Sequence, residues 1–200
     1  MKTEKEKSFD GEWYDPNGDA ELITERELAM DLCHQINLLP MNSPEREPLL
    51  AKLFPDKKPN AIIMNPIWAD YGLYYTIGEG SFINRNAYLM DGGKITIGNH
   101  CFIGPNCDMY TANHAFDPIE RRTGLEVALP ILIEDDVWIG GDVTITPGVT
   151  IGKGSIIGAK SLVNKDIPAN VIAVGNPCRV LRVLTEADKL SVKKSLITTD

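Results

Sequence analysis

The segment YTANHAFDP, residues 110–118, contains the side chain best suited to chemistry at neutral pH. This side chain is His114, and an imidazole with a pKa of about 6.5 can take a proton from a hydroxyl group near neutral pH. By itself, an exposed loop histidine is more often incidental than catalytic. His34 and His100 have no comparable setting, and we interpret both as structural or solvated.

The cysteines indicate no redox or metal chemistry. The chain has four of them and no CxxC pair, and the first residues, MKTEKEKSFDGEW, contain no apolar signal region. We therefore expect reduced, buried thiols in a cytoplasmic protein. No set of His, Cys, Asp and Glu has the spacing of metal ligands, so we expect no metal.

A six-residue repeat surrounds the histidine segment and predicts the fold. Aliphatic residues recur at Ile77, Ile83 and Leu89, at Ile97, Ile103 and Met109, and at Ile133, Ile139, Ile145, Ile151, Ile157 and Val163. Four positions after most of them stands a small or β-branched residue, for example Val137 or Cys101. A period of six fits neither a helix nor an alternating strand. It favours short strands joined by turns, with one aliphatic side chain per turn in a common core.

The repeat has corners and one long interruption. Gly140, Gly152 and Gly158 follow the aliphatic position, and we expect them to allow positive φ at the corners. Three short strands per turn would close a triangular prism. Between Met109 and Ile133 the sequence advances 24 residues where the repeat needs six. The excess, residues 110–130, is therefore a loop inserted into a rigid scaffold, which is where functional residues concentrate.

The regions that flank the repeat are expected to be helical. Residues 19–39 have mostly helical apolar spacing, through Leu22, Leu28, Leu32, Ile36 and Leu39. Ser43 and Pro44 suggest that a second helix begins there, and a last helix is expected after Thr185. We predict a helical cap over residues 1–58, a solenoid over 59–184 and a C-terminal helix and tail over 185–200. Such caps would cover the open ends of the solenoid.

Composition limits the partners. The net charge is −8, from 20 Lys and Arg against 28 Asp and Glu. This argues against nucleic acid and anionic membranes as partners, because both require clustered cations. No apolar run approaches the roughly 20 residues that span a bilayer. The 200 residues fit a single globular protein.

Several stretches resemble the hexapeptide-repeat acyltransferases, and most closely the maltose and galactoside O-acetyltransferases. They are ILIEDDVWIGGDVTITPGVTIGKGSIIGAKSLVNKDIPANVIAVGNPCRVLR, YTANHAFDPIERRTG and the N-terminal GEWY and EPLLAKLF. The resemblance implies a mainly β fold, a left-handed parallel β-helix with an N-terminal helical cap. It also implies acetyl transfer from acetyl-CoA to a sugar hydroxyl, by a homotrimer with active sites between subunits.

The resemblance also implies roles for single residues. His114 would be the general base, and the backbone N–H of Gly141 would bind the oxyanion. Asp31, Asp70, Asn84 and Glu126 match acceptor-side positions, although Asp31 could instead be a solvated helix residue, and Asp70 and Asn84 turn residues. Glu126 could bind the sugar or orient His114, and it favours the maltose-type subgroup. Galactoside enzymes have consecutive aspartates where this chain has Asp91 and Gly92, so the second carboxylate is absent.

The cofactor positions come from GAKSLVNKDIP and GNPCRVLR. By resemblance, a groove for pantetheine and nucleotide would be lined by Gly141, Ala159, Asn164 and Lys165, and Arg179 and Arg182 would contact phosphates. Without the resemblance both arginines would be ordinary surface cations. Trp138 would either pack near the thioester or form part of the solenoid wall.

Three alternatives belong to other classes. Carbonic anhydrases share this solenoid but need three histidine ligands, and this chain's histidines lack that arrangement. A non-catalytic binding or structural solenoid would have regular turns, contrary to the insertion at 110–130. An acetyltransferase for a non-sugar acceptor, such as an amine or an antibiotic hydroxyl, differs only in its acceptor, and fold does not determine the substrate.

Overall fold

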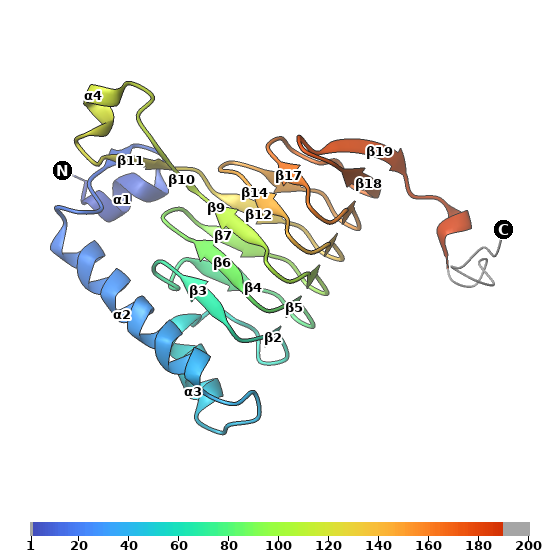
Figure 1. The fold of residues 1–200 in the computed structure, drawn as a ribbon, viewed down its shortest axis with the longest axis horizontal. Coiled ribbons are helices and arrows are strands. Elements are labelled where there is room, and N and C mark those ends of the chain that lie inside the picture. Colours follow the sequence, from blue (N-terminus) through green and yellow to red (C-terminus); the bar gives the residue numbers. More distant parts are fainter. Residues whose placement is uncertain (1, 190–200) are drawn as a thin grey trace.

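The computed structural model describes residues 2–189, and its main body is a parallel β-helix (Figure 1). Its three faces are parallel sheets, apart from the antiparallel last strand, in the strand orders β15-β12-β7-β4, β19-β18-β16-β13-β8-β5-β2 and β17-β14-β9-β6-β3. Successive strands along the chain belong to successive faces, which is the prism that the six-residue period predicts. The mainly β solenoid with few helices is therefore confirmed.

The strands of the solenoid are short, as one side of a triangular turn requires. Their bounds are β2 Ile62–Ile63, β3 Ile67–Ala69, β4 Tyr75–Ile77, β5 Phe82–Ile83, β6 Ala87–Met90, β7 Ile95–Ile97, β8 Phe102–Ile103, β9 Asp108–Tyr110, β12 Ile131–Ile133, β13 Trp138–Ile139, β14 Thr144–Ile145, β15 Thr150–Ile151, β16 Ile156–Ile157, β17 Leu162–Val163, β18 Val171–Val174 and β19 Arg179–Val183.

The aliphatic repeat positions form the core. Ile133 pairs in register with Ile97 on one side and Ile151 on the other, so equivalent positions stack along the solenoid. All twelve repeat residues named above are at most 1% exposed. Full burial of such a side chain stabilises the fold by roughly 1.5–3 kcal/mol. The four cysteines are free and buried, as expected.

The repeat glycines are needed for a reason other than the one expected. Gly140, Gly152 and Gly158 do not have positive φ, so that expectation was wrong. A Cβ on Gly140 would lie 2.6 Å from the backbone nitrogen of Ala159 in the next turn. Glycine therefore permits close approach between turns of the solenoid. Positive φ occurs at other corners, for example at Gly154 and at His100, which is a corner residue.

Three helices precede the solenoid: α1 Glu4–Phe9, α2 Ala20–Leu38 and α3 Arg46–Leu53. Helix α2 buries Leu32 and Ile36 as expected, but Leu28 is 55% exposed. The N-cap of α3 is Glu45 and not Ser43, because residues 41–45 form turns before the helix begins. Helix α1 was not predicted, although the capping box that Thr3 forms with Glu6 is visible in the sequence as TEKE.

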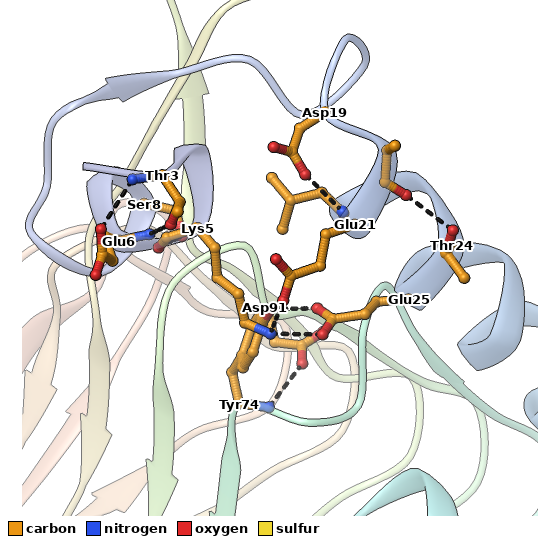
Figure 2. Close-up of polar contacts among 12 residues, drawn as sticks. Thr3, Lys5, Glu6, Ser8, Asp19, Glu21, Thr24, Glu25, Tyr74 and Asp91 are labelled. Carbon is orange, nitrogen blue, oxygen red and sulfur yellow. Dashed lines mark hydrogen bonds and ion pairs between the residues drawn. The ribbon is translucent and has the colours of Figure 1, made fainter. Parts of the chain in front are cut away.

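Polar contacts join the cap helices to the solenoid (Figure 2). Lys5 of α1 pairs with Glu21 and Glu25 of α2, and the Tyr74 hydroxyl donates to Glu25. The backbone N–H of Tyr74 donates to the buried Asp91 at 3.3 Å. The cap is thus connected to the turn that precedes β4.

The insertion after β9 folds into an antiparallel sheet outside the solenoid. Strand β10 Ala112–His114 pairs with β11 Glu126–Ala128, and β11 also pairs with β1 Trp13–Tyr14 from the N-terminal region. Between β10 and β11 lies the short helix α4 Pro118–Arg121, with Asp117 as its N-cap. Figure 1 shows this sheet beside α1, away from β18 and β19.

The last described element is a 3₁₀ helix, η1 Glu186–Asp188. The rest of the predicted C-terminal helix lies outside the described residues. Within residues 2–189, no helix combines the length and the apolar character that a bilayer crossing requires.

Candidate active site

The three-stranded sheet β1-β11-β10 presents His114. Its ring is half exposed, with a side-chain exposure of 50%. The imidazole Nδ1 lies 3.1 Å from the carbonyl oxygen of Leu125. A carbonyl oxygen can only accept, so Nδ1 carries the hydrogen and Nε2 carries the lone pair. The fold therefore holds His114 in the tautomer that a base acting through Nε2 requires.

Glu126 lies directly opposite His114 across the β10–β11 pair. Its Oε1 is 3.8 Å from the His114 Nε2, and its Oε2 accepts a 2.7 Å hydrogen bond from the Tyr14 hydroxyl. Burial raises the Tyr14 pKa well above its ordinary value, so the hydroxyl keeps its proton. The structure thus brings Glu126 next to His114 and adds Tyr14, which was not expected at the site from the sequence.

Two of the expected acceptor residues line one cavity of about 680 Å³. Asp31 and Asp70 face it together with Arg26, Met30, Cys33, His34, Trp68, Ala69 and Tyr88. Asp70 accepts a 2.6 Å hydrogen bond from the Tyr88 hydroxyl, and burial raises the pKa of its carboxyl although this bond opposes the rise. A wall of aromatic, cationic and carboxylate groups suits a small polar ligand.

Asn84 does not line this cavity. It follows β5, and its side-chain oxygen accepts from the N–H of Arg85, as in a turn. Asp91 is fully buried and accepts from the N–H groups of Tyr71 and Tyr74, so it serves the local fold. A Cβ on Gly92 would lie 2.7 Å from the Tyr14 hydroxyl oxygen.

The expected oxyanion donor is available. Among the hydrogen bonds of residues 2–189, the Gly141 N–H has no acceptor, whereas its carbonyl accepts from the Lys160 N–H at 2.9 Å. Gly140, next to it, packs against Ala159 of the following turn. Gly141 and Ala159 are therefore neighbours on adjacent turns.

The other expected cofactor residues are exposed near the C-terminal end of the solenoid. Arg179 contacts the side chain of Asn164 at 3.5 Å, and Lys165 follows Asn164. Arg182 instead makes two 2.7 Å hydrogen bonds to Asp188. Trp138 is 54% exposed on β13, between Phe102 and Ile156 of the neighbouring strands, so it forms a partly exposed part of the solenoid wall.

No sequence motif indicated Arg26, Trp68 and Tyr88 in the cavity, or Tyr14 beside Glu126. No periodic signal distinguishes them, because each reaches its site through tertiary packing. Tyr14 was visible only as part of GEWY. Within residues 2–189, no group of three or more His, Cys, Asp or Glu side chains gathers where it could hold a metal ion.

Family models match both parts of the chain. One described as a maltose acetyltransferase hexapeptide capping motif matches residues 7–58. A bacterial transferase hexapeptide model with six repeats matches 130–165, and a hexapeptide repeat of succinyl-transferase matches 94–109.

Solved structures agree with these matches. A maltose O-acetyltransferase from Clostridium difficile 630 is 43% identical with a TM-score of 0.87, over 92% of this chain and 99% of that one. A hexapeptide-repeat acetyltransferase from Vibrio cholerae in complex with acetyl-CoA is 39% identical with a TM-score of 0.85, over 92% and 100%. A galactoside acetyltransferase in complex with coenzyme A is 34% identical with a TM-score of 0.88, over 94% of each.

The solenoid and these similarities define the class of this protein, a hexapeptide-repeat acetyltransferase. Within that class, the N-terminal capping motif is decisive. The chain belongs to the maltose and galactoside O-acetyltransferase family.

Proposed function

We propose that this protein transfers the acetyl group of acetyl-CoA directly to a hydroxyl group of a sugar, with His114 as the general base. The observation that carries the proposal is the setting of His114. Its Nδ1–H is engaged by the Leu125 carbonyl, which leaves the Nε2 lone pair free on a half-exposed ring. The names of the similar structures, maltose and galactoside acetyltransferases, support a sugar acceptor.

In the proposed reaction, His114 Nε2 takes the hydroxyl proton as the sugar oxygen attacks the thioester carbonyl. The Gly141 N–H donates to the oxyanion of the tetrahedral intermediate. The imidazolium then returns its proton to the sulfur of the departing CoA, so the protons balance and no acyl-enzyme forms. The Glu126 carboxylate lies 3.8 Å from Nε2, where positive charge develops as the proton is taken up.

The cavity around Asp31 and Asp70 is the proposed acceptor site. Hydroxyl-rich ligands are recognised by carboxylates, which accept their hydrogen bonds, and by aromatic faces. Asp31, Asp70 and Trp68 provide these groups and line the same cavity. Asn84 and Glu126 are the further acceptor-side candidates, from their match to the family pattern.

Coenzyme A is proposed to bind along Gly141, Ala159, Asn164 and Lys165. The similar structures solved with acetyl-CoA or coenzyme A support this ligand. The residues present fit it, because Gly141 offers an N–H without an acceptor in residues 2–189 and the exposed Lys165 and Arg179 suit phosphates. Arg182 would reach a phosphate only by leaving Asp188.

We propose a homotrimer that completes each site between two subunits. In one chain the sheet with His114 lies beside α1, whereas β17, which Asn164 and Lys165 follow, lies next to β18 and β19 (Figure 1). At the tip of the insertion, Phe116 is 95% exposed and Ile119 is 70% exposed. Such exposure is unusual for large apolar side chains that no partner covers. A neighbouring subunit would both cover this tip and supply the other half of the site.

The test combines acceptors with variants. Acetyl-CoA is mixed with maltose, glucosides, galactosides, chloramphenicol or serine, and release of the CoA thiol is followed. His114→Ala should lower the best turnover by about 10²–10⁴-fold with acetyl-CoA binding unchanged. Turnover near the wild-type rate would refute the role of His114, and a preference for chloramphenicol or serine would refute the sugar acceptor.

Subunit sharing is tested by complementation. His114→Ala and the double variant Arg179→Glu with Lys165→Glu should each be nearly inactive, and co-refolded mixtures should regain part of the activity. No recovery in proven mixed trimers would place the whole site within one chain. A fully active monomer in sedimentation would exclude the shared site.

A further inference from the structure

Tyr14 is a buried residue without a role in the proposed reaction. It ends the short strand β1 and is 1% exposed. Its ring packs in a small cluster with Leu22, Tyr71, Tyr74 and Ala128, at the junction of the N-terminal region and the insertion. Its hydroxyl donates to Glu126 Oε2 at 2.7 Å. A buried hydroxyl directed at the carboxylate beside His114 needs an explanation.

The register of the outer sheet places three side chains in one row. Tyr14 is directly opposite Glu126 in the β1–β11 pair, and Glu126 is directly opposite His114 in the β10–β11 pair. Directly opposed residues on antiparallel strands share a face of the sheet and lie close together. The order along the row is therefore Tyr14, Glu126, His114, with the two oxygens of Glu126 divided between its neighbours.

Gly92 provides the space for this arrangement. Gly92 is buried, and a Cβ there would lie 2.7 Å from the Tyr14 hydroxyl oxygen but 3.7 Å or more from Ala112 and Thr111. Any side chain at this position would displace the hydroxyl before it disturbed its other neighbours. Glycine at 92 and the bond from Tyr14 to Glu126 are therefore linked.

We propose that Tyr14 is a positioning residue for His114 that acts through Glu126, and that Gly92 is required to admit its hydroxyl. This inference rests on the proposed function. The hydrogen bond holds one oxygen of Glu126, so the other stays beside Nε2, where the proton arrives. The N-terminal region thereby contributes to catalysis and does not only cap the solenoid.

The first test is Tyr14→Phe, which removes the hydroxyl and keeps the packed ring. We expect kcat to fall by about tenfold, the scale of a lost hydrogen bond to a charged group. The KM for acetyl-CoA should stay within about twofold, because Tyr14 is buried and cannot contact the coenzyme directly. Tyr75→Phe is the matched control, since the buried Tyr75 hydroxyl has no hydrogen-bond partner within residues 2–189. It should keep wild-type kcat.

A double-mutant cycle separates positioning from a general structural role. In a Glu126→Ala background, Tyr14→Phe should cause no further loss of kcat, because the group through which it acts is gone. A full additional tenfold loss in that background would overturn the proposal.

Gly92→Ala provides an independent test. It should lower kcat about as much as Tyr14→Phe, because the new methyl group displaces the hydroxyl. In the Tyr14→Phe background it should add little, since the crowded atom is absent. Wild-type kcat in Gly92→Ala or in Tyr14→Phe, with His114→Ala inactive, would overturn this inference and leave the proposed function intact. An active His114→Ala enzyme would refute the proposed function itself.

Discussion

His114 and Glu126 face each other across one antiparallel strand pair, with Nε2 and Oε1 3.8 Å apart. This separation exceeds a hydrogen bond and is within the range of an ion pair. The carboxylate can therefore stabilise an imidazolium without blocking the lone pair that must first accept a proton.

The charge of Glu126 is expected to matter more than its shape. Glu126→Gln keeps an oxygen for Tyr14 but removes the charge, so kcat should fall by roughly tenfold, as expected for a charge close to a catalytic proton transfer. Glu79→Gln, an exposed change between β4 and β5, should have little effect. Steady-state kinetics with the best acceptor measures both, and equal rates for the two variants would contradict the electrostatic role.

Asp70 is expected to control acceptor affinity. Asp70→Asn should raise the KM for the acceptor about tenfold, the usual worth of one hydrogen bond donated to a charged group, and leave the KM for acetyl-CoA unchanged. Tyr88→Phe should give a smaller rise, because Tyr88 donates to Asp70. Asp136→Asn, an exposed change outside this cavity, is the control. An unchanged acceptor KM in Asp70→Asn would exclude the cavity as the acceptor site.

Asp91 should make stability depend on pH. Burial raises the pKa of its carboxyl to about 7, above the ordinary value in the unfolded chain. The folded protein thus favours the protonated form of Asp91. This form contributes to the free energy of unfolding, and that contribution is lost as pH rises from about 4 to 7. The loss is on the order of 4 kcal/mol.

Asp91→Asn cannot ionise, so it should not lose stability between about pH 4 and 7. The difference in free energy of unfolding between the variant and the wild type should therefore shift in favour of the variant as pH rises. Urea unfolding at several pH values measures the difference. Asp135→Asn is a contrasting control, because the Asn99 N–H lowers the pKa of Asp135 and its contribution is instead lost as pH falls. A constant difference between Asp91→Asn and the wild type would contradict the prediction.

Adjacent glycines should respond differently to alanine. At Gly140 a Cβ meets backbone atoms of the next turn at 2.6 Å, so Gly140→Ala should lower the free energy of unfolding by about 1–3 kcal/mol. At Gly141 the nearest atoms are those of Pro105 at 3.3 Å, and the N–H is kept. Gly141→Ala should therefore retain stability and most of the activity. Thermal unfolding and turnover are measured for both variants. A Gly141→Ala protein less stable than Gly140→Ala would contradict the packing described.

Activity is expected to be independent of metal ions. Neither the sequence spacing nor the described residues provide a ligand set, and the proposed reaction needs only His114 and Gly141. Dialysis against EDTA should leave turnover unchanged. Loss of activity that zinc restores would contradict this.

Much of this protein follows from local pattern. The period of six placed the twelve core residues, because each turn of a solenoid repeats the same local environment and contacts only its neighbours. The break in the period located the insertion and His114. The repeat pattern also includes Gly140, but it does not show why glycine is needed there. The reason is close approach to Ala159, which depends on how the turns stack.

The sequence by itself determined the solenoid, its core and the segment that carries the candidate base, because these depend on short-range periodicity. Only the tertiary structure decided which side chains surround that base. Tyr14 and Glu126 are 112 positions apart, and no local pattern relates them. They meet because β1 adds to the edge of the inserted hairpin, and that pairing is a long-range contact between two segments outside the repeat.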